Sequence, residues 1–197
     1  MRDDAFRGPA AVTCVYFMLY LGFMILQLKT RGAAVDRARA QGTEVPAGKS
    51  FADSVANDPG ARMGERTFLN TLEQMGVFLG ALWMCAIFVS PPLATWLGGA
   101  AVLARSTFPV LWSMGEGGAW NIRVELSTQP YYCCVLGMLG AVATWAFTGV
   151  NIAEALPSTP LLGAAVVAFY VVSFVLAFGV GMVLHGSTRS AYESERL

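Results

Sequence analysis

Residues 64–89 read GERTFLNTLEQMGVFLGALWMCAIFV, a polar segment that leads directly into an apolar run. A helix needs about 20 mostly apolar residues to cross the hydrocarbon layer of a bilayer, because lipid cannot satisfy exposed backbone groups. The stretch therefore predicts a membrane-spanning helix over 68–89. The first turns of this helix carry polar side chains, which are costly at membrane depth and need a structural or functional reason.

Four other runs are apolar enough for the same prediction: 10–28, 91–112, 129–150 and 160–184. The 197-residue chain is 55% hydrophobic and only 13% charged, whereas a soluble domain carries about 25% charged residues. We expect an all-α integral membrane protein. Residues 1–150 would form a four-helix transmembrane bundle with a polar loop over 29–67, and residues 151–197 would add a C-terminal transmembrane helix and a short polar tail.

The 13 basic and 13 acidic side chains balance, so the chain has no net field that would attract nucleic acid. The single histidine and the four scattered cysteines form no cluster with metal-ligand spacing. Two basic residues lie on one side of the five predicted spans and ten on the other, the side that includes the loop 29–67. The positive-inside rule predicts that this loop faces the cytosol or its organellar equivalent.

Three polar residues at the start of the span 68–89 share one helical face. Arg66, Asn70 and Glu73 are spaced i, i+4 and i+7, and residues at this spacing lie above one another on a helix. Together they offer a guanidinium, an amide and a carboxylate to one elongated ligand with carboxylates at one end and an ammonium group at the other. The alternative is that the charged pair forms structural ion pairs with neighbouring helices.

Arg105 interrupts the span 91–112 and is a further charge at membrane depth. Its side chain is close enough to the predicted cytosolic end to reach the interface or to pair with Glu73. A third interpretation is a tether between two helices. We favour the tether.

The polar stripe also carries a resemblance to a known family. The run Glu65-Arg66-x-x-x-Asn70-x-x-Glu73, followed by Phe78-Leu79-x-x-Leu82-Trp83, resembles the membrane-associated proteins in eicosanoid and glutathione metabolism (MAPEG). This family includes microsomal glutathione transferases and leukotriene C4 synthase. The likeness extends through Ala104-Arg105 toward Arg123 and covers about residues 10–150.

The resemblance implies a homotrimer of four-helix subunits, with glutathione in a cytosol-facing cleft between neighbours. Arg66 would bind a glutathione carboxylate, Glu73 the ammonium group and Asn70 a backbone amide. Arg123 would correspond to the arginine that stabilises the thiolate, and Arg31, just after the first span, is a second candidate. A nearby guanidinium lowers the pKa of a thiol and favours its nucleophilic form.

The implied activity is a glutathione transferase or peroxidase that acts on lipophilic electrophiles delivered by the membrane lipids. We expect a multi-pass protein of the endoplasmic reticulum or of an organellar membrane.

Other features favour a non-catalytic alternative. Synthase-like members of the family carry two tyrosines after the third-span arginine, where this chain has Phe108 and Trp112. Acidic residues on both sides of Arg123 would weaken its field toward a thiolate. The long first loop and the span 160–184 have no clear counterpart in the family. The main alternative is a structural subunit that keeps the helical scaffold and packs into a larger membrane assembly. A weaker alternative is a lipid-binding scaffold without chemistry.

Overall fold

The computed structural model describes residues 3–42, 55–115, 121–156, 160–172 and 175–176. Its elements, in chain order, are η1 (Asp3–Phe6), α1 (Arg7–Ala40), α3 (Pro59–Phe88), α4 (Pro91–Ser106), α5 (Phe108–Ser113), η3 (Ile122–Val124), α6 (Glu125–Thr148) and α7 (Ile152–Ala155). A further helix, Pro160–Val172, follows α7. These described residues contain no strand, which confirms the all-α prediction.

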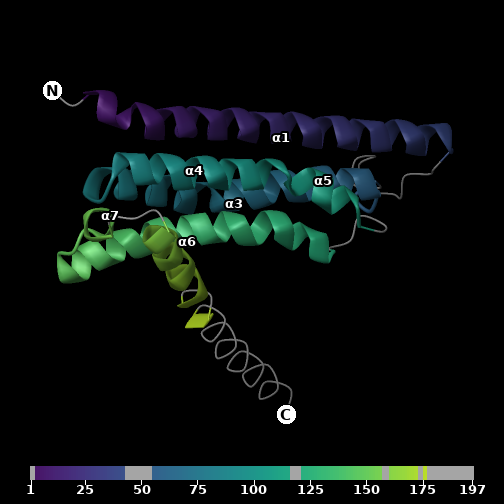
Figure 1. Ribbon diagram of the computed structural model, residues 1–197. Coiled ribbons are helices and arrows are strands. Elements are labelled where there is room, and N and C mark those ends of the chain that lie inside the picture. The colour runs from purple at the N-terminus through teal and green to yellow at the C-terminus, as the bar shows by residue number, and fades with distance from the viewer. Residues whose placement is uncertain (1–2, 43–54, 116–120, 157–159, 173–174, 177–197) are drawn as a thin grey trace, which may run out of the picture.

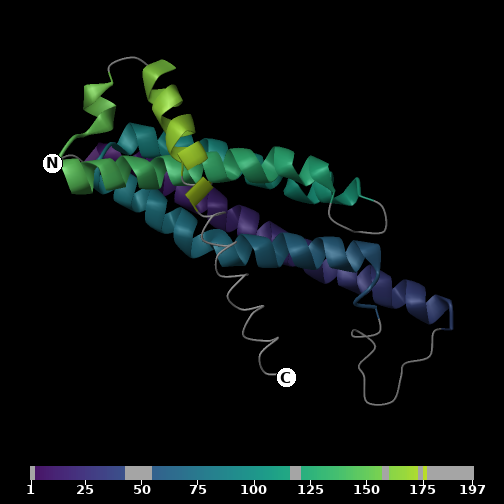
Figure 2. The same cartoon turned by 90° about the horizontal axis from the view of Figure 1, so that it is seen from below.

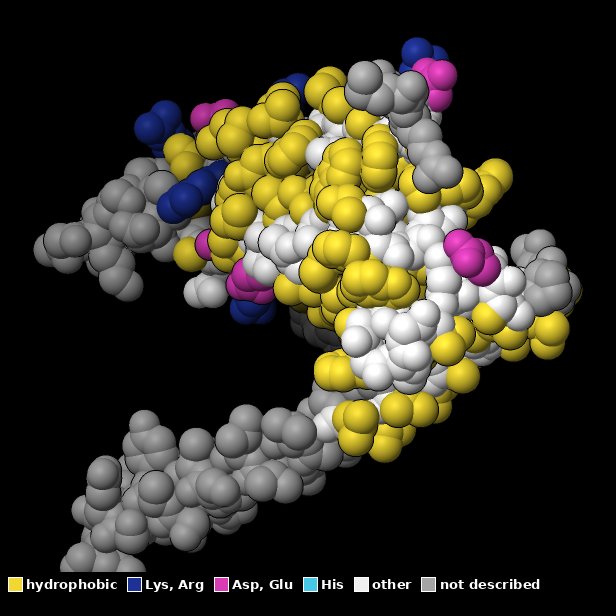
Figure 3. All heavy atoms as spheres, turned by 90° about the vertical axis from the view of Figure 1, so that its left-hand side faces the viewer, with side chains coloured by type: hydrophobic (Ala, Val, Ile, Leu, Met, Phe, Trp, Pro, Cys, Tyr) yellow, Lys and Arg dark blue, Asp and Glu magenta, His cyan; other side chains and the backbone are white. Residues whose placement is uncertain are grey.

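The long helices lie side by side in a bundle (Figure 1). α3 and α4 contact each other and both outer helices, and α1 and α6 lie on opposite sides of this pair. Three described segments are long and apolar enough to cross a membrane: Asp4–Ala40, Pro59–Phe88 and Ile122–Thr148. Hydrophobic side chains cover much of the described surface when the bundle is viewed from one end (Figure 3). The protein is an integral membrane protein built on a helical bundle.

The helices α1 and α3 extend well beyond the predicted spans. α1 continues to Ala40 and α3 begins at Pro59, so the predicted polar loop 29–67 is helical at both of its ends. A helix can continue beyond the membrane through polar residues, because water satisfies its exposed groups there. A proline at the first position, such as Pro59, also favours the start of a helix. The side chain of Asp58 caps α3 by accepting hydrogen bonds from the N–H groups of Gly60 and Ala61.

An ion pair joins these two extensions. Nη2 of Arg37 lies 2.9 Å from both carboxylate oxygens of Asp58. Next to this pair, Ala34 of α1 packs with Val55 and Ala61 in a small buried cluster. The end of α1 is therefore attached to the start of α3.

The third predicted span, 91–112, consists of two helices. α4 ends at Ser106 and α5 begins at Phe108, with Pro109 in its first turn. Proline lacks the N–H group that would continue the hydrogen-bond ladder, so the regular helix is interrupted here. The interruption gives α5 a position of its own against α3, which matters for the pocket described below.

The additional C-terminal helix packs against α6 (Figure 2). A Cβ atom on Gly137 would lie 2.5 Å from Cγ1 of Val166, and one on Gly140 would lie 2.5 Å from the ring of Phe169. Such close approach requires glycine. The helix is described over 160–172, and the end of the predicted span, 177–184, lies outside the described residues.

Candidate functional site

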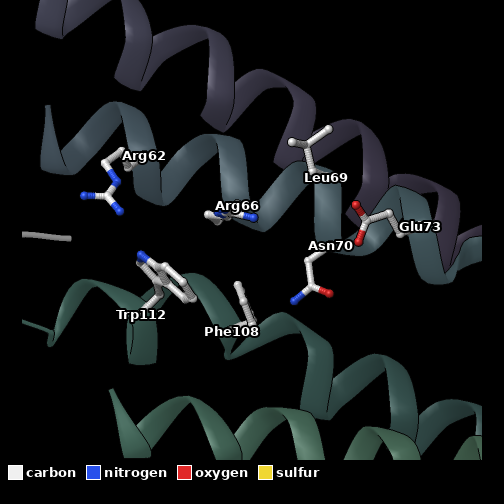
Figure 4. Close-up of a pocket in the computed structure, with 7 residues that line it drawn as sticks. All are labelled: Arg62, Arg66, Leu69, Asn70, Glu73, Phe108 and Trp112. Atoms are coloured by element: carbon white, nitrogen blue, oxygen red, sulfur yellow. The ribbon is translucent and has the colours of Figure 1, made fainter. Parts of the chain in front are cut away.

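A pocket of about 420 Å³ lies between α3 and α5. This volume is within the range of small-molecule sites, about 300–1,000 Å³. Its lining comprises Arg62, Arg66, Leu69, Asn70 and Glu73 from α3, and Phe108 and Trp112 from α5 (Figure 4). The α3 residues recur every three or four positions and form one face of the helix. The three residues predicted from their spacing therefore share one pocket.

The outer end of the pocket, nearest the start of α3, presents hydrogen-bond donors. Arg62 is half-buried and Arg66 is exposed, and neither forms an ion pair with another described residue. The side chain of Trp112 is buried, and within the described part of the chain its Nε1 has no hydrogen-bond partner. Arginine and the indole N–H only donate hydrogen bonds, so this end is suited to an anion.

Asn70 is held in one orientation by its neighbour one turn further along α3. Nε2 of Gln74 donates to Oδ1 of Asn70 at 2.9 Å and to the hydroxyl oxygen of Tyr132 on α6 at 2.7 Å. The amide nitrogen of Asn70 is left on the side of the pocket (Figure 4). Asn70 therefore offers a donor to a ligand, and Gln74 positions it.

Glu73 supplies the negative charge at the inner end of the pocket. Its carboxylate is exposed and forms no ion pair with another residue that the structure describes. The pocket is thus cationic at one end and anionic at the other. A ligand complementary to it carries acidic groups at one end and an ammonium group at the other.

Arg105 lies in the core behind the pocket and is fully buried. Its Nε donates to Oγ1 of Thr71 on α3 at 3.2 Å. The guanidinium carbon lies 4.8 Å from the ring centroid of Phe108 and 5.2 Å from that of Tyr131 on α6, distances typical of cation–π contacts. The tether interpretation is confirmed, because the side chain is fully buried against residues of neighbouring helices and forms no ion pair with Glu73.

The two arginines predicted to act on a thiolate lie away from this pocket. Arg123 is an exposed residue of η3 and is not part of the lining. Arg31 lines a separate, smaller pocket together with Gln27 and Glu65. Within one chain, the structure therefore does not bring either arginine together with Arg66, Asn70 and Glu73.

Some residues of the pocket were not predicted from the sequence. Arg62 precedes Arg66 by four positions, so the same helical spacing that identified the stripe would have included it. Gln74, which contacts Asn70, is linked to Tyr132 on α6, 58 positions further along the chain, and no local pattern indicates this link.

The sequence pattern of the MAPEG family matches residues 9–152, and the chain belongs to this family. The match ends before the helix Pro160–Val172. One relative, described as "Uncharacterized protein sll1147" from Synechocystis sp. (strain ATCC 27184 / PCC 6803 / Kazusa), is 35% identical over 106 residues, which cover 53% of this chain and 66% of that protein. The chain therefore spans just under two thirds of the length of this relative. No solved structure gives a significant match.

Proposed function

We propose that the protein is a membrane-bound glutathione transferase or peroxidase that binds glutathione in the pocket between α3 and α5. The observation that carries the proposal is the presence of Arg66, Asn70 and Glu73 in one pocket of suitable size. Membership of the MAPEG family supports the same function.

The pocket offers a matching group to each polar part of such a peptide. Arg66 binds a carboxylate, because a guanidinium matches its geometry and charge. Glu73 binds the ammonium group, and the amide nitrogen of Asn70 donates to a peptide carbonyl. In the transferase reaction the thiol loses its proton and the sulfur forms a bond to an electrophilic carbon of the lipophilic acceptor, from which a leaving group departs or to which a proton adds.

The proposal includes a homotrimer with the pocket covered by a neighbouring copy. Arg66 and Glu73 are exposed in the single chain although they begin a membrane-spanning segment, and an uncovered charge facing lipid is costly. The thiolate-stabilising cation, Arg31 or Arg123, would come from the neighbouring copy. Basic residues are concentrated at the end of α1 and the start of α3, and they support placement of the pocket on the cytosolic side.

Calorimetry of the purified full-length protein in nanodiscs with glutathione tests the proposal. We expect binding in the wild type, and a tenfold to hundredfold loss of affinity in Arg66→Met and Glu73→Gln, because a charge-assisted hydrogen bond contributes about 1.5–3 kcal/mol. Arg7→Met is the matched control, since Arg7 pairs with Asp4 on an exposed surface outside the pocket lining. A folded protein that binds no glutathione at millimolar concentration contradicts the proposal.

A structural subunit of a larger membrane assembly is the second candidate function. Two observations favour it: the α5 wall carries Phe108 and Trp112, which have no hydroxyl group, and Arg123 lies outside the pocket. Binding of glutathione without turnover of any electrophile or peroxide, together with copurification of other chains, would support this candidate over the enzyme.

A further inference from the structure

We propose that Arg62 and Trp112 form an outer subsite that binds a second carboxylate of the peptide ligand and selects ligands with an acidic group at that end. The inference rests on the proposed function, because it names a determinant of specificity in the same pocket. Neither residue belongs to the Arg66, Asn70 and Glu73 stripe.

The charges of the pocket lining favour a ligand with two acidic groups. Among the residues that the structure describes, the lining contains two guanidinium groups, Arg62 and Arg66, and one carboxylate, Glu73. None of the three is neutralised by an ion pair with another described residue. A peptide with two carboxylates and one ammonium group is complementary to this set, whereas a ligand with a single carboxylate leaves one arginine without a partner.

Trp112 provides an independent observation at the same end of the pocket. Its side chain is only 9% exposed, and its buried Nε1 has no hydrogen-bond partner among the described residues. A buried donor without a partner is unfavourable, so a ligand atom that accepts its hydrogen bond is bound more tightly. The nitrogen-bearing edge of the indole faces the guanidinium of Arg62 across the pocket (Figure 4).

The indole is also fixed in place, as a binding site requires. Trp112 stacks on Phe108 with ring centroids 5.7 Å apart, and Val124 is buried in the same cluster. Nδ2 of Asn121 donates to the carbonyl oxygens of Leu111 at 3.1 Å and of Trp112 at 3.4 Å, which holds the end of α5.

The length of the pocket determines which ligand reaches the subsite. A helix rises 1.5 Å per residue, so Arg66 lies about 10 Å and Arg62 about 16 Å from Glu73 along α3. An extended peptide covers about 3.3–3.6 Å per residue, or about 7 Å for a dipeptide and about 10 Å for a tripeptide. Of the two, only the tripeptide is long enough to bind Glu73 through its ammonium group and to place a second acidic group within reach of the Arg62 side chain.

The test compares two probes by calorimetry of the full-length protein in nanodiscs. The probes are glutathione and its monoethyl ester on the glycine carboxylate, in which an ethyl group replaces the second negative charge. We expect the wild type to bind glutathione tenfold to hundredfold more tightly than the ester. Arg62→Met should reduce the affinity for glutathione by the same factor and leave the affinity for the ester unchanged.

Trp112→Phe is the second variant, because it removes the N–H donor and keeps an aromatic ring that can stack on Phe108. This variant should reduce the affinity for glutathione about threefold to tenfold and leave the affinity for the ester unchanged. Equal affinity of the wild type for both probes, or an equal loss for both probes in Arg62→Met, overturns the subsite while the proposed function stands. If the folded wild type binds neither probe, both the subsite and the proposed function are overturned.

Discussion

Nε of Arg105 donates a hydrogen bond to Oγ1 of Thr71 at 3.2 Å and thereby joins α4 to α3 inside the buried core. The carbonyl oxygen of the same threonine accepts from the hydroxyl group of Tyr16 on α1 at 3.1 Å. Three helices therefore meet at one residue. Because the guanidinium of Arg105 also contacts the ring of Phe108, this core supports the wall of the pocket.

Thr71→Val should destabilise the protein, because it leaves the buried Nε of Arg105 without an acceptor. We expect a loss of about 1–3 kcal/mol in the free energy of unfolding. Thr144→Val is the matched control, since the hydroxyl of Thr144 donates to the carbonyl of Gly140 in its own helix and bonds to no other residue that the structure describes. Unfolding in detergent measures the stability of both variants. Equal losses of unfolding free energy would show that the hydrogen bond between Thr71 and Arg105 adds no measurable stability.

Gly64→Ala should also destabilise the bundle, since α1 and α3 approach closely there. A Cβ atom at this position would lie 2.2 Å from Oγ1 of Thr30 and 3.0 Å from the backbone Cα of Gln27. Overpacking of this kind costs about 1–3 kcal/mol. Gly76→Ala in the same helix meets no atom within 4 Å, and we expect its thermal midpoint to remain unchanged or to rise. If Gly64→Ala has the same thermal midpoint as the wild type, the close approach of α1 and α3 at this position is contradicted.

Asp58 should make the start of α3 sensitive to acid. Burial raises the pKa of Asp58, but hydrogen bonds from Arg37 and from the N–H groups of Ala61 and Gly60 outweigh this effect and lower the pKa below its usual value of 3.8. A lowered folded-state pKa gives stabilisation that is present above pH 3.8 and is lost as the pH falls through the folded-state value.

Amide exchange at Gly60 and Ala61, corrected for intrinsic rates, measures this effect. Protection in the wild type should fall below about pH 4. Asp58→Asn keeps a capping side chain and should show no such pH dependence. Asp58→Ala removes the cap and should lose about 1 kcal/mol of local stability at neutral pH. A pH-dependent loss of protection in Asp58→Asn would exclude the carboxylate as its cause.

Gln74→Met should weaken the proposed binding of glutathione although Gln74 does not line the pocket. The variant removes the donor that holds Oδ1 of Asn70. Loss of one neutral hydrogen bond costs about 0.5–1.5 kcal/mol, which corresponds to a twofold to twelvefold loss of affinity. Calorimetry measures the change, and Tyr132→Phe, which removes the acceptor on the far side of Gln74, should show a smaller loss. Wild-type affinity in both variants would exclude this positioning role.

Local sequence determined the membrane helices and the polar stripe. Hydrophobic run length is a property of neighbouring residues, and it identified α1, α3 and α6 with errors mainly at their ends. The observed helix ends differ from the predicted ones because helices continue into water until a capping residue such as Asp58 marks their end. Helical geometry is equally local, so the spacing of Arg66, Asn70 and Glu73 was enough to place them on one face.

Only the tertiary structure decided which other side chains surround that face. The interruption at Thr107 sets the position of α5 and brings Phe108 and Trp112 opposite α3, while Arg123 remains on the surface of η3. Likewise, the partners of Arg105 come from three separate helices. Such contacts depend on how whole helices pack against one another, and packing angles are set by side chains distant in sequence, so no local pattern specifies them.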